Sequence, residues 1–154
     1  MSHAADGVDT VVVRPRKTMI VAWVCAVVVF ALFLVVAVVL RTAETGVFFR
    51  LADQIAMAAI GALIAGGVLL LARPRVRADA EGIEVRNVLV TRTLPWDVVE
   101  RVAFPDGASW ARLELIGDDY LPVLAIQAVD GQRAVEGIRR VRALHAAAVR
   151  PQRP

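Results

Sequence analysis

Residue types that commonly carry out catalysis or bind metals are scarce in this chain. Its two histidines are His3 and His145 and its single cysteine is Cys25, so neither an intramolecular disulfide nor a cluster of metal ligands is expected. The one serine after residue 72 is Ser109, which has no obvious base, and the sequence has no glycine-rich phosphate loop or HExxH motif. We therefore expect a protein that is not an enzyme and uses no cofactor.

Aromatic and charged side chains around residue 110 indicate a binding surface instead. Trp110, Arg112 and Glu114 alternate with apolar residues, which places them on the polar side of a predicted strand. Tryptophan and arginine are frequent among the residues that contribute most to protein–protein binding. We take these three residues as the candidate site for an unknown protein partner, with partial burial of Trp110 as the alternative, and expect Trp96 to lie in a core.

Positive charge is concentrated beside the apolar part of the sequence. From Ala78 onward ten arginines are balanced by eleven acidic residues, so the excess comes from the preceding residues. Nucleic acid is not an expected partner, because no aromatic platform accompanies the arginines. We expect anionic lipid headgroups to contact six basic residues: Arg14, Arg16, Lys17, Arg73, Arg75 and Arg77.

Two uncharged segments predict a transmembrane hairpin. Residues 18–40 rise about 1.5 Å per residue as a helix, long enough to cross the roughly 30 Å hydrocarbon layer. Residues 55–72 are shorter and rich in alanine and glycine, and Arg73 ends them. The remaining parts are predicted as a flexible cytoplasmic tail (residues 1–17), an extracytoplasmic loop (41–54), a domain (73–149) and a C-terminal tail (150–154).

The basic residues also predict how the hairpin is oriented. They precede the first span and follow the second, and loops rich in lysine and arginine usually stay in the cytoplasm. We therefore expect a multi-pass protein of the inner (plasma) membrane, with its N-terminus and C-terminal domain in the cytoplasm.

Small residues recur along the second predicted span. Ala58, Ala62 and Gly66 are four positions apart, and such a stripe lets another helix approach closely. The expected contact is within the hairpin, at Ala22 and Ala26 of the first span. A homo-oligomer formed through the transmembrane helices is the alternative.

After residue 72 the pattern changes from long apolar runs to short alternating segments. Ile83 and Val85 alternate with polar residues, and similar segments separated by turn residues follow, which predicts about six or seven β-strands. Residues 132–149 have apolar residues every three or four positions and predict an amphipathic helix, with Asp130 as its N-cap. The expected domain is a bent antiparallel sheet, as a sandwich or open barrel, closed by this helix.

Several of these segments together resemble a known family. They are the two spans, RPRVRADAEGIEVRN from residue 73, Pro95-Trp96 before Asp97-Val98-Val99, WARLEL from residue 110, and AIQA from residue 125 with Asp130-Gly131. Over residues 15–148 the chain is similar to the actinobacterial membrane-anchored bacterial PH-domain proteins of the low molecular weight antigen type. The resemblance implies a PH-like α+β domain on a membrane α hairpin, and it implies no reaction.

The expected function is a membrane-anchored adaptor that recruits or scaffolds a protein partner at the inner face of the membrane. One alternative is an anionic-lipid-sensing module that uses the basic residues. Another is a structural subunit that associates through its transmembrane hairpin. Contacts made by exposed arginines should weaken at high salt, whereas an apolar contact at Trp110 should not.

Overall fold

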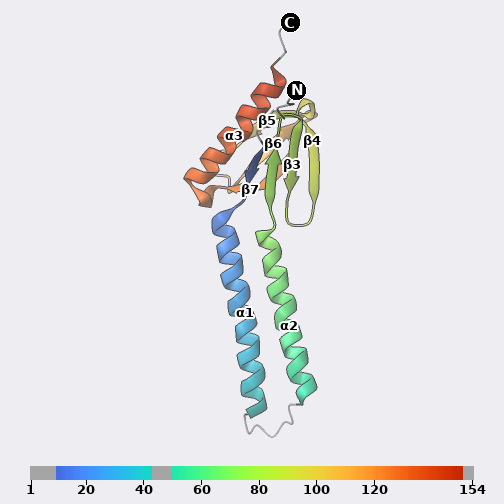
Figure 1. Cartoon of the computed structure of the whole chain (residues 1–154), viewed down its shortest axis with the longest axis vertical. Helices are drawn as coiled ribbons and strands as arrows, with labels where there is room; N and C mark the ends of the chain where they lie inside the picture. The colour runs from blue at the N-terminus through green and yellow to red at the C-terminus, as the bar shows by residue number, and fades with distance from the viewer. Residues whose placement is uncertain (1–9, 43–49, 151–154) are drawn as a thin grey trace, which may run out of the picture. The chain divides into compact units, whose positions relative to one another are not determined.

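The computed structural model describes residues 10–42 and 50–150 (Figure 1). The chain divides into two compact units, one formed by Lys17–Arg73 and the other by Met1–Arg16 together with Pro74–Pro154. The predicted C-terminal tail, except Arg150, and parts of the predicted N-terminal tail and loop lie outside the described residues.

The first unit consists of two apolar helices. These are α1 (Arg16–Thr42) and α2 (Leu51–Leu69), and a short 3-10 helix, η1 (Leu70–Ala72), continues α2. Both are long and apolar enough to cross a membrane, and 11% and 6% of the residues in their candidate spans are buried. A core helix of a soluble protein would be mostly buried, so these two helices are candidate membrane spans.

Both helices extend into the segment predicted as loop 41–54. α2 begins early because the backbone N–H of Arg50 donates to the Asp53 carboxylate at 2.9 Å, and the Asp53 N–H donates back to the Arg50 carbonyl at 3.1 Å. These reciprocal bonds satisfy polar groups at the helix start. Arg41 of α1 also donates to the Gln54 side chain at 3.1 Å.

The packed side of α2 differs from the predicted stripe of small residues. Gly61 and Ala65 are the buried residues of α2, whereas Ala62 is exposed and Ala58 is only half-buried. A Cβ on Gly61 would lie 2.6 Å from the Phe33 Cβ of α1. The contact within the hairpin therefore does not follow the predicted stripe, because several faces of α2 carry small residues. The alternative, a homo-oligomer formed through this stripe, stays a prediction.

Gly66, the third residue of the predicted stripe, does not pack within the hairpin either. A Cβ added to it would meet nothing within 4 Å. On α1, by contrast, Ala22 and Ala26 are buried as expected, and so is Ala37.

Within the described residues the second unit contains two antiparallel sheets that are not closed into a barrel. The sheet orders are β1-β2-β3-β4 and β5-β6-β7. The strands are β1 (Val11–Val13), β2 (Arg75–Ala78), β3 (Gly82–Arg86), β4 (Thr91–Pro95), β5 (Val99–Ala103), β6 (Trp110–Leu115) and β7 (Asp119–Gln127). This arrangement confirms the predicted antiparallel fold, with the sandwich alternative closer than the barrel.

Strand β1 is a correction to the prediction of a flexible tail over residues 1–17. Val11 pairs with Ala78 and Val13 with Val76, so β1 covers what would otherwise be the edge of β2. Val11 and Val13 pack against the core, while Val12 between them is exposed. Residue 137 of the C-terminal helix is a glycine, and a Cβ there would lie 3.1 Å from Val13.

The core lies between the sheets and the C-terminal helix α3 (Gln132–Val149), which contacts β1, β5 and β7 (Figure 1). Trp96, in the 3-10 helix η2 (Trp96–Val98), is buried as predicted, and its indole N–H donates to the Asp79 carbonyl at 2.8 Å. The prediction of Asp130 as N-cap is wrong. Gly131 occupies that position, and Asp130 is buried in the preceding 3-10 helix, η3 (Ala128–Asp130).

Candidate functional site

The candidate partner site lies on β6, the central strand of its sheet. Ala111 and Leu113 are fully buried, so the alternate residues Trp110, Arg112 and Glu114 lie on the outer side of the strand. Cross-strand pairing brings two further residues to the same face of the sheet. Glu114 is opposite Arg101 of the neighbouring strand β5 and opposite Tyr120 of the other neighbouring strand, β7. We call these five residues the β6 face.

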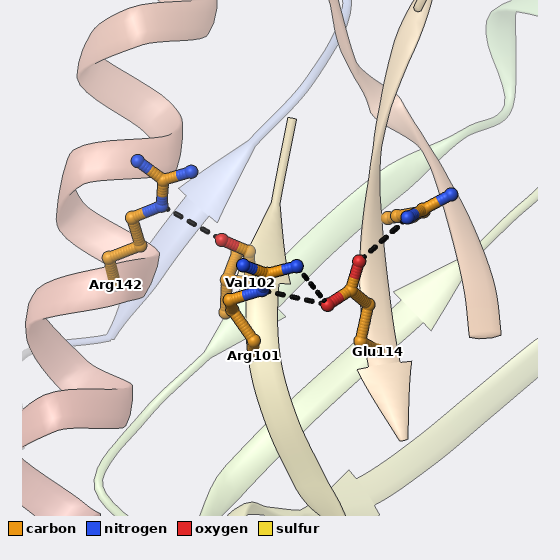
Figure 2. A network of polar contacts seen from close by, with 5 residues as sticks. Arg101, Val102, Glu114 and Arg142 are labelled. Atoms are coloured by element: carbon orange, nitrogen blue, oxygen red, sulfur yellow. Dashed lines mark hydrogen bonds and ion pairs between the residues drawn. The ribbon is translucent and has the colours of Figure 1, made fainter. Parts of the chain in front are cut away.

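Glu114 holds two arginines of the β6 face in fixed positions. One carboxylate oxygen accepts bonds from Arg101 Nε at 2.7 Å and Nη2 at 2.6 Å (Figure 2). The other oxygen accepts from Arg112 Nε at 3.1 Å and Nη2 at 2.7 Å. The Arg112 guanidinium also lies over the Tyr120 ring, 5.6 Å from its centroid, at a distance suited to a cation–π interaction.

The same contacts determine the charge of Glu114. Hydrogen bonds from Arg112 and then from Arg101 lower the pKa of the carboxyl group below its usual value, because both donors favour the ionised form. Glu114 therefore stays charged at neutral pH and continues to orient both arginines.

Large apolar side chains next to this network remain accessible. Trp110 is 45% exposed and Tyr120 is 60% exposed, so neither is a core residue. About half of the Trp110 surface is covered, which fits the alternative of partial burial, and its contact with a partner stays a prediction. Arg101 and Tyr120 were not predicted from the sequence, because their place beside Glu114 depends on the strand register.

Strand β5 is an edge strand, and α3 covers part of that edge. Arg142 Nε donates to the Val102 carbonyl at 2.9 Å (Figure 2), and a His145 ring nitrogen lies 2.7 Å from the Val99 carbonyl. These side chains satisfy carbonyls that would otherwise be open to another strand. This edge of the sheet is therefore partly closed to pairing with another strand.

The six basic residues predicted to contact lipid are divided between the two units. Arg75 and Arg77 lie on β2, and Arg75 forms an ion pair with Glu84 of β3 at 3.1 Å. The others are at the ends of the helical segments: Arg14 just before α1, Arg16 and Lys17 in its first turn, and Arg73 directly after η1.

Metal-binding side chains are not clustered in residues 10–42 and 50–150. No cluster of three or more histidine, cysteine or acidic side chains occurs there.

Two packed antiparallel sheets with a C-terminal helix define a PH-like domain, and residues 73–144 match the bacterial PH domain family. Uncharacterised proteins of Mycobacterium bovis and of two strains of Mycobacterium tuberculosis are 45% identical to this chain over 134 residues, which is 87% of this chain and 87% of theirs. The chain therefore belongs to the bacterial PH domain family, as the resemblance predicted. No solved structure gives a significant match.

Proposed function

We propose that this protein is a membrane-anchored adaptor whose PH-like domain binds a protein partner through the β6 face. The observation that carries the proposal is that two suitable side chains lie two positions apart on β6. Trp110 is half-exposed, and Arg112 is held by Glu114 and Tyr120. Tryptophan, tyrosine and arginine are the residue types most enriched where partners bind tightly.

The fixed geometry of Arg112 supports this proposal. A free arginine side chain loses much rotamer freedom when a partner immobilises it, and this loss opposes binding. Arg112 is already held by two bonds to Glu114 and by the Tyr120 ring, so less freedom remains to be lost. The β6 face is in this sense prepared for a partner.

Anchoring by α1 and α2 completes the proposed role. Two spans would confine the domain to the membrane, and the basic residues flanking them favour the cytoplasmic side of the inner membrane. Confinement raises the effective concentration of the domain for partners at the same surface. Recruitment would then need only moderate affinity at the β6 face.

Site-specific photocrosslinking in native membranes tests the adaptor proposal. A photoreactive amino acid replaces Ile116 in the full chain, because this residue is 69% exposed and directly follows β6. The variants Trp110→Ala and Leu89→Ala are compared at low and high salt. Leu89 is the control because it is 81% exposed and lies in the turn between β3 and β4, two strands of the sheet that does not contain β6. We expect a crosslinked protein that persists at high salt, weakens about tenfold with Trp110→Ala and is unchanged with Leu89→Ala.

Two results would contradict the adaptor proposal. One is the absence of any specific crosslink, and the other is the same crosslinks in both variants. Capture that disappears at high salt would favour the lipid-sensing alternative. Capture of the same partner by the isolated hairpin would favour a structural subunit that associates through its spans.

A further inference from the structure

A second surface with unusual charge lies on the outer side of the β1–β4 sheet. Arg75 of β2 and Arg86 of β3 are directly opposite each other in the antiparallel register. Both lie on the outer side, because the alternate residues Val76 and Val85 are fully buried. Two like charges at opposed positions of neighbouring strands repel each other.

The protein itself neutralises this pair only in part. Glu84 bonds one terminal nitrogen of Arg75 at 3.1 Å. The Nε atoms of Arg75 and Arg86 are both buried, and neither has a hydrogen-bond partner within the described residues. A buried donor without a partner is unfavourable, and native proteins usually supply one, often as a bound ion.

We propose that Arg75 and Arg86 together bind a phosphate-bearing anion. The forked donors of a guanidinium match the oxygens of a phosphate group, and two adjacent guanidinium groups offer donors from both sides. Thr91 of β4 is the register partner of Arg86, which adds a hydroxyl group to the same row of the sheet. The anion would relieve the repulsion between the arginines by bonding the accessible parts of their guanidinium groups. A shift of the two side chains would then let it also accept from the Nε donors that are buried without partners.

Charge restricts this site to one end of the sheet. Arg77 also lies on β2, but its register partner is Glu84. Arg77 and Glu84 line a hollow with Asp79 and Glu81, whose negative charge disfavours an anion. Arg77 therefore provides a matched control with the same side chain, the same strand and the same face.

This inference is independent of the adaptor proposal, because it concerns a different sheet from the β6 face. The phosphate could belong to a phospholipid headgroup or to a soluble compound. Both sources share the chemistry that the two arginines recognise, so the experiment needs a probe for each.

The test measures binding to the full chain in detergent micelles. The probes are phosphatidylglycerol, zwitterionic phosphatidylcholine as its lipid control, and inorganic phosphate. Native mass spectrometry counts retained lipids, and a thermal-shift titration follows phosphate. Wild type is compared with Arg75→Gln, Arg86→Gln and Arg77→Gln, and circular dichroism checks that each variant is folded.

We expect Arg75→Gln and Arg86→Gln each to weaken anion binding roughly tenfold, as loss of a charge-assisted hydrogen bond would do. Arg77→Gln should weaken it by no more than about twofold, through the loss of general electrostatic attraction. Binding of phosphatidylglycerol alone would assign a lipid headgroup, and binding of inorganic phosphate as well would assign a soluble phosphate group. If one variant fails to fold, the other and the control still decide the comparison.

Two outcomes would overturn the proposal. Equal weakening by all three substitutions would mean that the arginines act only through net charge. Failure of the folded wild-type chain to bind either anionic probe above phosphatidylcholine would mean that no anion site exists at Arg75 and Arg86.

Discussion

Asn87 connects the two sheets through both ends of its side-chain amide. Its Nδ2 group donates to the Pro122 carbonyl at 2.8 Å, and its Oδ1 atom accepts from the Leu124 N–H at 3.2 Å. Asn87 directly follows β3, whereas Pro122 and Leu124 belong to β7. The side-chain amide thus forms the same two kinds of hydrogen bond with β7 that a backbone amide would form, and these bonds connect the two sheets.

Replacing this amide should therefore destabilise the domain. Asn87→Ala leaves a partly buried carbonyl and N–H without partners, and we expect the free energy of unfolding to fall by about 1–3 kcal/mol. Urea titration of the detergent-solubilised chain, followed by circular dichroism, measures this change. Hydrogen exchange at the Leu124 amide should become faster.

Asn87→Asp provides the control for the Asn87 prediction. It keeps an acceptor for the Leu124 N–H but removes the donor to the Pro122 carbonyl. Exchange at Leu124 should then stay closer to wild type than in Asn87→Ala, while unfolding still becomes easier. Wild-type stability in both variants would show that the amide does not hold the sheets together.

At the scale of elements, the hairpin depends on one close approach between its helices. Residue 61 is a glycine where α2 meets Phe33 of α1, and a Cβ there would lie 2.6 Å from the Phe33 Cβ. An added methyl group must push the helices apart or move the Phe33 side chain. Gly66, on another side of α2, has open space around it.

This difference predicts opposite effects for two identical substitutions. Gly61→Ala should lower the stability of the hairpin by about 1–3 kcal/mol through overpacking. Gly66→Ala should leave it unchanged or raise it by up to about 1 kcal/mol, because alanine favours the helix. Unfolding of the full chain by titration with a denaturing detergent measures both.

A further substitution identifies the cause of the Gly61 effect. Adding Phe33→Ala to Gly61→Ala makes room for the methyl group, so the double variant should lose less than the two single variants would by simple addition. Equal effects of alanine at positions 61 and 66 would instead place the hairpin contact elsewhere on α2.

At the scale of the whole molecule, the orientation in the membrane decides which compartment the β6 face meets. The basic residues before α1 and after α2 predict that both chain ends are cytoplasmic. Cys25 is the single cysteine, so Cys25→Ala gives a background in which introduced cysteines report their own location. In intact cells an impermeant maleimide should label Thr45→Cys but not Asp106→Cys.

Permeabilised cells provide the control for this orientation. Both introduced cysteines should then be labelled, because the reagent reaches the cytoplasm. Labelling of Asp106→Cys in intact cells would invert the topology and remove the β6 face from cytoplasmic partners.

Local patterns in the sequence were sufficient to predict the main elements. The uncharged runs, the alternation around Ile83 and Val85 and the helical spacing of residues 132–149 each arise within a short segment. The antiparallel α+β domain could therefore be predicted without coordinates, and the family was predicted from the resemblance of several segments to known proteins. The burial of Trp96 was also predicted from the sequence and is confirmed.

Contacts between distant segments were decided only by the tertiary structure. β1 forms because three valines near the N-terminus meet the edge of β2, more than sixty residues later in the chain. The packed side of α2 could not be chosen from its sequence, because alanine and glycine occur on several sides of that helix. The pairs Arg101–Glu114 and Arg75–Arg86 require a particular strand register, which no local pattern specifies. Sequence periodicity thus determined which elements form, and packing between them determined which side chains meet.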